Sequence, residues 1–152
     1  MFLLQSNELL DHTTNIIHEK TQQHAFSVDL TVAEIYTFSG AGSLDFGGSE
    51  FQPAPAEPVD PEKKKEEDDY GWWTLGSGIY KAIFNEQLKN REDTLAVIAP
   101  HQHASEAGIL AETVLIPPER KAEPVSYIFR VPAVGCHIKE NARIATLHIL
   151  AD

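Results

Sequence analysis

Cysteine is almost absent from this sequence. Its 152 residues include one cysteine, Cys136, so no disulfide can form within the chain. Long apolar runs are absent too, because the N-terminal MFLL gives way at once to QSNELLDH. That run is too short for the core of a signal peptide and far too short to cross a membrane. We therefore expect a protein of the reducing cytoplasm, with no membrane partner.

Basic side chains are also scarce. Only 12 Lys and Arg residues stand against 23 Asp and Glu residues, which gives a formal net charge of −11 at pH 7. The resulting field repels phosphate backbones and anionic lipid surfaces, so nucleic acid is not an expected partner. The same field opposes a nucleoside triphosphate unless local cations or backbone N–H groups overcome it.

Common hydrolase and zinc motifs are missing as well. Residues 40–43 read GAGS and lack the final glycine of the nucleophile elbow G-x-S-x-G. The sequence contains neither a cysteine pair nor the H-E-x-x-H zinc motif. These absences argue against a serine hydrolase and against a standard zinc site.

Short strand-like runs make up most of what is present. Apolar residues form 42% of the chain, enough for a single domain over 1–152 with a real core. In residues 26–35, Phe26, Val28, Leu30 and Val32 alternate with polar residues, which predicts a strand with one buried face. Further short runs rich in Val, Ile, Thr and aromatics follow between turn residues. The pattern predicts an all-β fold, a distorted barrel or jelly-roll-like sandwich, and a short N-terminal helix capped by Ser6 or Asn7.

Residues 52–70 have a different composition. Four prolines precede the dense charge block EKKKEEDD. Such a segment has little apolar surface to bury, so we expect a flexible, disordered loop inserted in the domain. Trp72 and Trp73 follow it, and adjacent strand residues face opposite ways, so we expect one of them in the core and the other at an interface or groove.

Four stretches resemble, in the same order, blocks of the trimeric dUTPase and dCTP deaminase superfamily. They are the DL dipeptide in HAFSVDLTV, the run WWTLGSGIYKAIFNEQL, the run IAPHQHASEAGI, and the closing ENARIATLHIL. In the second block Leu75, Gly78, Tyr80 and Glu86 match, while Ser77 stands where the family usually has proline. The resemblance implies a β-rich, distorted barrel that forms a homotrimer with nucleotide sites between subunits.

The third block departs from the family pattern P-R-S-S-L-A-R-x-G, whose arginine and serines bind the triphosphate. Here His101 aligns with the arginine of the pattern, Gln102 and His103 align with the serines, and Glu106 aligns with the second basic position. A histidine of ordinary pKa is mostly neutral at pH 7, whereas arginine offers phosphate a permanent charged fork. The nucleotide-binding positions that the resemblance implies, in this degenerate form, are Pro100, His101, Gln102, His103, Ser105, Gly108 and Arg143.

The later catalytic blocks are altered too. The family's D-x-G-Y-x-G block supplies the aspartate that handles the attacking water, but here Pro117 and Pro118 stand near its place. No aspartate occurs in residues 95–151, and residues 125–129 lack the glutamate of the deaminase branch. Thr146 replaces the usual glutamine of the closing strand, and the sequence ends at Asp152 without the glycine-rich arm of dUTPases.

Three functional hypotheses remain open. The first is a cytoplasmic homotrimer that has lost standard catalysis and acts as a nucleotide-binding or regulatory protein, with Mg²⁺ expected only if a triphosphate binds. The second is an active but divergent deoxyribonucleoside triphosphate enzyme, a dCTP deaminase or dUTP diphosphatase, with His101, His103 and Glu112 as catalytic candidates. The third is a metal- or partner-binding β-trimer without a nucleotide role.

The metal hypothesis depends on two histidines. If residues 101–103 form a strand, His101 and His103 project from one face and could bind zinc or copper with a third ligand. Candidates for that ligand are His137, His148 and Glu106. Two surface histidines beside a proline turn are the simpler interpretation.

Overall fold

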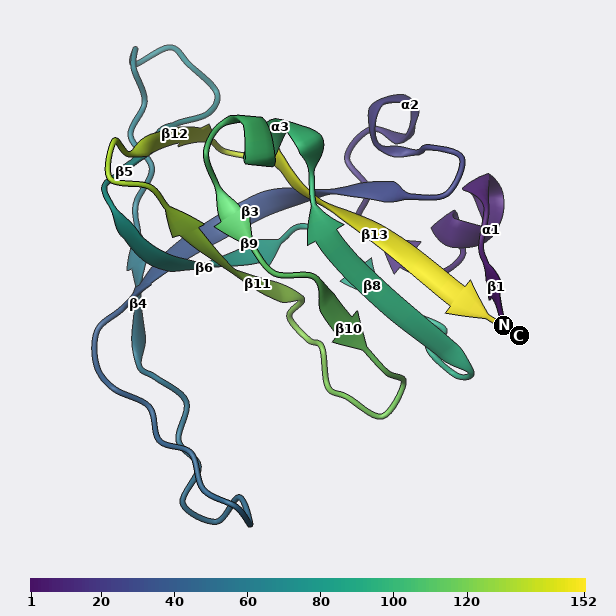
Figure 1. Ribbon diagram of the computed structural model, residues 1–152. Helices are drawn as coiled ribbons and strands as arrows, with labels where there is room; N and C mark the ends of the chain where they lie inside the picture. Colours follow the sequence, from purple (N-terminus) through teal and green to yellow (C-terminus); the bar gives the residue numbers. More distant parts are fainter.

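A curled antiparallel sheet dominates the computed structural model, which describes residues 1–152 (Figure 1). Its nine strands are β1 (Phe2–Leu3), β3 (Val28–Phe38), β4 (Ala56–Val59), β6 (Gly78–Phe84), β8 (Thr94–Pro100), β9 (Leu110–Ala111), β10 (Val114–Ile116), β11 (Ser126–Val131) and β13 (Arg143–Ala151). Their order in space is β10-β8-β13-β3-β6-β11-β9, with β1 paired to β13 and β4 paired to β3. The predicted all-β fold is confirmed, and the sheet closes only into a half-barrel.

Smaller elements complete the chain. One pair of strands joins β5 (Trp72–Leu75) to β12 (Cys136–Lys139), and another joins β2 (Thr13–Thr14) to β7 (Gln87–Leu88). The helices are all short: α1 (Ser6–Leu10), α2 (Glu19–Gln22) and α3 (Gln102–Glu106). None of them has the length and apolar character needed to cross a membrane.

The core lies on the inner face of the curled sheet. Along β11, Tyr127 and Phe129 are buried while the residues between and beside them are exposed, as the two-residue period of a strand requires. The ring of Phe129 stacks on Tyr80 of β6 with 5.7 Å between centroids, and Tyr127 lies 5.8 Å from Phe84. These cross-strand aromatic pairs fix the register of β11 on β6.

Strand β3 departs from the predicted one-sided burial. Val28 and Leu30 are buried as expected, but Asp29 and Thr31 on the opposite face are equally inaccessible, and Phe26 lies outside the strand and is exposed. The cause is tertiary: β13 and β6 flank β3, and α2 contacts it. A buried polar face on a central strand requires internal partners for each polar group.

The N-terminal helix and the tryptophan pair largely follow the sequence. Helix α1 begins at Ser6, but Gln5 is the N-cap and no side chain caps the helix. Trp73 is 2% exposed and its Nε1 donates a 2.6 Å hydrogen bond to the carbonyl oxygen of Val59. Trp72 is half-buried, with the ammonium group of Lys64 4.1 Å from its ring centroid.

The proline-rich and charged segment 52–70, for which a flexible, disordered loop is predicted, includes one short strand. Residues 56–59 form β4, which pairs with the last part of β3, and Glu62 bridges Trp72. Val59 packs against the core, and Pro58 is tolerated because β4 lies at the edge of the sheet. Residues 56–59 thus have a strand conformation, and the flexibility expected for the segment 52–70 stays a prediction.

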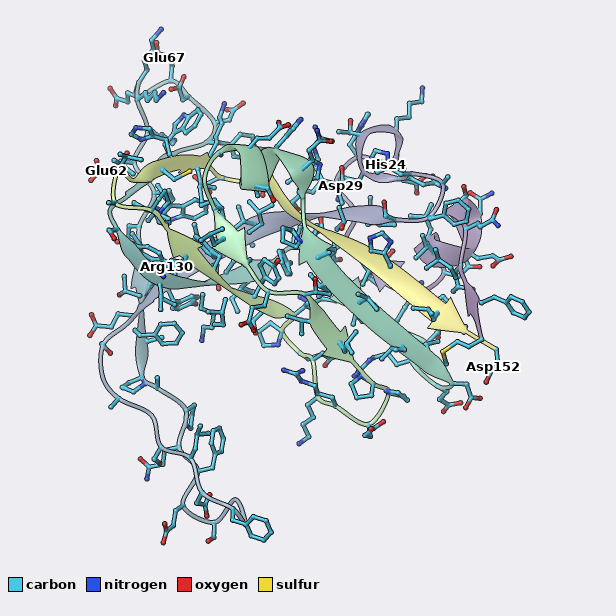
Figure 2. The ribbon with its side chains drawn as sticks, in the orientation of Figure 1. His24, Asp29, Glu62, Glu67, Arg130 and Asp152 are labelled. Carbon is cyan, nitrogen blue, oxygen red and sulfur yellow. The ribbon has the colours of Figure 1, made fainter.

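A hairpin formed by residues 39–55, hereafter the arm, connects β3 to β4. In Figure 1 it leads away from the sheet as a long blue loop, and in Figure 2 it lies at the opposite end of the molecule from the charged loop that carries Glu62 and Glu67. Its base is held by a hydrogen bond from the Ser39 amide to the Pro55 carbonyl oxygen at 2.8 Å.

The core contains one unsatisfied hydroxyl, which gives a first prediction. The hydroxyl of Tyr127 is buried without a hydrogen-bond partner, and burial raises its pKa to about 12. Removing it by Tyr127→Phe should therefore raise the free energy of unfolding by about 1 kcal/mol. The measurement is urea denaturation of the purified variants.

Tyr80→Phe is the matched control, because the Tyr80 hydroxyl donates a 2.9 Å hydrogen bond to the Gly76 carbonyl oxygen. This variant should lose about 1 kcal/mol. Equal losses in the two variants would mean that the Tyr127 hydroxyl has a partner after all.

Candidate functional site

The strands β8, β13 and β3 lie side by side where the third block of the sequence begins. Ala145 of β13 pairs with both Pro100 of β8 and Leu30 of β3, and the next residue, Thr146, pairs with Asp29. The chain then leaves β8 at Pro100 and turns into α3, with the His101 amide bonded to the Ile144 carbonyl oxygen at 3.1 Å. This arrangement gathers side chains from three other parts of the chain around Asp29.

The carboxylate of Asp29 is the centre of the cluster. Its Oδ2 atom lies 2.9 Å from Nη1 of Arg143, 3.0 Å from Nε2 of His24 and 3.5 Å from Nε2 of His101. His24 approaches from the segment before β3 (Figure 2). Asp29 is 1% exposed, so its charge depends on these partners rather than on water.

His101 is the N-cap of α3 and has both ring nitrogens engaged. Its Nδ1 accepts a 2.9 Å hydrogen bond from the His103 amide, so the proton of the neutral ring belongs on Nε2, which faces Asp29. Burial lowers the pKa of His101 below the ordinary 6.5, with smaller contributions from His103 and Arg143, and the nearby Asp29 opposes the shift. His101 therefore has no free basic nitrogen to offer a water molecule or a substrate.

A second buried carboxylate lies close by. Glu86, which follows β6, is 1% exposed and accepts hydrogen bonds from the Thr31 amide at 2.7 Å, the Thr31 hydroxyl at 2.6 Å and the Gln22 amide group at 2.9 Å. Asn85 extends the network from Thr31 to Asn141. This network ties α2, β3 and the β6–β7 turn together, and it leaves Glu86 no access to a substrate.

The other predicted nucleotide-binding residues are dispersed over α3 and its ends. Gln102 is exposed and its amide group donates to the Glu106 carboxylate at 3.0 Å, and Ser105 is also exposed. Gly108 adopts a φ of +91°, where a side chain would be strained, and a Cβ there would lie 3.2 Å from the Pro132 ring. The backbone conformation of the turn after α3 therefore accounts for a glycine at position 108.

Among the three catalytic candidates, the structure brings together His101 and His103, whose rings lie 4.7 Å apart between centroids. Glu112 does not join them. It lines a separate groove of about 600 Å³ on the outer face of β11, hereafter the β11 groove, together with Arg120 and Arg130.

The strand geometry that a metal site at His101 and His103 would need is not present. Residues 101–103 are the cap and first turn of a helix rather than a strand, because the chain turns after Pro100. No group of three or more His, Cys, Asp or Glu side chains is arranged to hold a metal ion. In the Asp29 cluster, Arg143 occupies the place that a cation would take.

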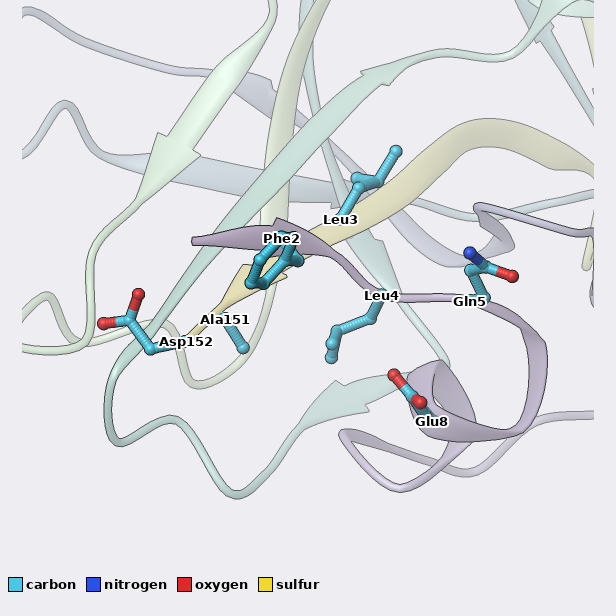
Figure 3. A pocket seen from close by; sticks show the side chains of 7 residues that line it. All are labelled: Phe2, Leu3, Leu4, Gln5, Glu8, Ala151 and Asp152. Atoms are coloured by element: carbon cyan, nitrogen blue, oxygen red, sulfur yellow. The ribbon is translucent and has the colours of Figure 1, made fainter.

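Another pocket lies at the chain ends, between β1, α1 and the end of β13 (Figure 3). Its lining includes Phe2, Leu4 and Ala151 with the carboxylates of Glu8 and Asp152. No candidate site residue lines it, and no Lys or Arg side chain does either.

Comparison with known proteins supports the resemblance. The chain is 32% identical over 154 residues to a protein of Methanosarcina mazei named "Probable deoxyuridine 5'-triphosphate nucleotidohydrolase", covering 97% of this chain and 86% of that relative. A protein of the same name from Methanosarcina acetivorans is 33% identical over the same length. The chain belongs to the dUTPase and dCTP deaminase superfamily. No family model matches the sequence.

A solved structure supports the superfamily fold. The 2'-deoxycytidine 5'-triphosphate deaminase of Agrobacterium tumefaciens aligns with a TM-score of 0.70 over 99% of this chain at 16% identity. The chain spans about half the length of that deaminase, since it covers 48% of it. This likeness concerns the fold alone.

The sequence does not indicate that Asp29 and His24 organise the site of this superfamily member. The alternation in residues 26–35 predicts that Asp29 lies on the polar face of a strand, and His24 only opens the stretch HAFSVDLTV. The available signal was a charged residue in the middle of an apolar strand, since such a residue must be either exposed or paired. The partner, Arg143, is separated from Asp29 by more than a hundred residues.

The Glu86 network yields a second prediction. All three groups that contact Glu86 are donors, so Glu86→Gln would place an amide N–H₂ against at least one donor. We expect a loss of roughly 2 to 3 kcal/mol in the free energy of unfolding, measured by urea denaturation. Glu67→Gln, the same change in the exposed charged loop, should have almost no effect. If both variants match the native protein, the network does not stabilise the fold.

His101 yields a third prediction, on pH. Because its pKa is lower in the folded chain than in the unfolded chain, the unfolded chain binds more protons in the window below about 6.5. The free energy of unfolding should therefore fall as pH is lowered from 7.5 to 5.5. His101→Gln should flatten this slope, whereas His137→Gln, at an exposed position of β12, should not. Parallel slopes for native protein and His101→Gln would contradict the assignment.

Proposed function

We propose that this chain is a homotrimeric member of the superfamily that performs neither standard dUTP hydrolysis nor standard dCTP deamination. In this proposal it acts as a nucleotide-binding or regulatory protein. The observation that carries it is the Asp29 cluster. His101 stands where the family has its phosphate-binding arginine, and it is turned inward onto Asp29 together with Arg143.

The charges around α3 support the loss of a triphosphate site. Arg143 is paired with Asp29, and residues 98–109 contain no Lys or Arg. Glu106 is exposed and adds negative charge to the block. A chain with a net charge of −11 needs local cations to hold a triphosphate, and this block supplies none that are free.

The carboxylates support the loss of the standard chemistry. Asp29 and Glu86 are both enclosed by donors and cannot reach an attacking water. Glu112 lies in the β11 groove, away from the His101 and His103 pair. A general base must lie within hydrogen-bond reach of its proton, and no enclosed carboxylate here meets that requirement.

A binding screen tests this proposal. A ligand that prefers the folded state raises the melting temperature by mass action. Without a phosphate cradle, deoxyuridine, dUMP and dUTP should produce similar small shifts, with little dependence on Mg²⁺. Pyrophosphate and ammonia, assayed in the same samples with dUTP and dCTP, should stay at background.

Release of either product would overturn the non-catalytic proposal. Loss of that release in Glu112→Gln but not in His101→Gln would assign the chemistry to the β11 groove. A shift that grows strongly with phosphate number would show that a cation site has been rebuilt. A flat response to all nucleotides would leave only the regulatory role.

A further inference from the structure

Internal hydrogen bonds define the conformation of the arm, residues 39–55. The backbone of Ser43 exchanges hydrogen bonds with Gln52 at 2.9 and 3.1 Å. At the tip, the carboxylate of Asp45 accepts from the amides of Gly48 and Glu50 at 3.1 and 3.0 Å. A Cβ at Gly42 would lie 2.8 Å from the Gln52 carbonyl oxygen, so only glycine allows the two sides of the arm to approach this closely.

The arm presents large apolar side chains to solvent. Leu44 is 90% exposed, Phe46 is 109% exposed and Phe51 is 54% exposed. No part of the same chain covers them, since the arm leads away from the sheet (Figure 1). Three such side chains on a hydrogen-bonded hairpin whose other residues are small, polar or proline indicate a contact surface.

A complementary surface lies in the β11 groove. Arg130 of β11 pairs across the sheet with Ile79 on one side and with Leu110 on the other, and Ile128 is two residues along the same face. Ile79, Leu110 and Ile128 are 56%, 66% and 47% exposed. These side chains give the groove an apolar floor in a volume of about 600 Å³.

The charges of the two surfaces are opposite. The tip of the arm carries the carboxylates of Asp45 and Glu50, whereas the β11 groove carries Arg120 and Arg130 against a single Glu112. Neither arginine takes part in an ion pair within the chain. Two copies of a chain with a net charge of −11 repel each other over most of their surface, so a locally basic groove marks where an acidic tip can dock.

We propose that the arm of one copy docks Leu44, Phe46 and Phe51 in the β11 groove of a second copy. Each half of the arm has about eight residues and can reach about 25 Å, more than the radius of gyration of about 15 Å for a domain of this size. The contact joins two different surfaces, so repeating it around a three-fold axis closes a ring. The inference rests on the self-association in the proposed function and assigns it a specific interface.

Sedimentation equilibrium of the full chain tests this interface. The native protein should form trimers, and Phe46→Asp combined with Phe51→Asp should raise the concentration for half-dissociation at least tenfold. Ile128→Asp in the groove should do the same. All three side chains are exposed in the single chain, so circular dichroism should show that these variants keep the fold.

A charge exchange provides the specific test. Arg130→Glu alone and Glu50→Lys alone should each weaken the trimer at low salt, and the double variant should restore it at least partly. The Glu50 carboxylate has no partner within the chain, which makes it suitable for this exchange. Glu67→Lys, an equal charge change on the distant charged loop, is the control and should not weaken the trimer.

Each contrary outcome is distinct. Trimers that survive the arm variants would overturn this interface and leave the proposed trimer standing. Dissociation by the arm variants without any effect of Ile128→Asp or Arg130→Glu would show that the arm docks on another partner surface, which also overturns the proposal. A native protein that is monomeric at all concentrations would refute both the interface and the trimer, while the nucleotide screen would still test the remaining part of the proposed function.

Discussion

The pairing of the buried Asp29 carboxylate is the constraint on which the rest of the site depends. A fully buried carboxylate is costly unless it has charged or hydrogen-bonded partners, and Asp29 obtains them from three separate segments. Arg143 begins the last strand, His24 precedes β3, and His101 ends the turn after β8. The interactions of the Asp29 carboxylate therefore fix the positions of three segments. The hydrogen bonds of Glu86 fix the positions of α2 and the β6–β7 turn relative to β3.

Polar side chains that bind one another inside the protein cannot bind a ligand. Arginine and histidine side chains that stabilise Asp29 are not available to a ligand, and the cap role of His101 keeps its ring against the helix. The aromatic pairs of the core and the register of β11 on β6 involve no residue of the third block. The residues that form the core and the residues around Asp29 are thus different sets, so the fold does not depend on the chemistry at that site.

Much of the fold could be predicted from the sequence, because strand periodicity and the order of the four blocks are local properties. The alternation of Tyr127 and Phe129 with exposed neighbours is visible in the sequence alone. The two-sided burial of β3 is not, since it depends on strands that are distant in sequence. Likewise, nothing local shows that His101 turns inward, and the order of residues 56–59 depends on an edge position supplied by β3.

The place of β13 in the sheet has a consequence for synthesis. It lies between β8 and β3, near the middle of the sheet, yet it follows every other strand along the chain. During synthesis, the edges of β3 and β8 that pair with β13 have no hydrogen-bonding partner until β13 has left the ribosome. Unpaired strand edges favour aggregation of incomplete chains, so nascent chains of this topology are expected to depend on chaperones or on fast translation of the segment that forms β13.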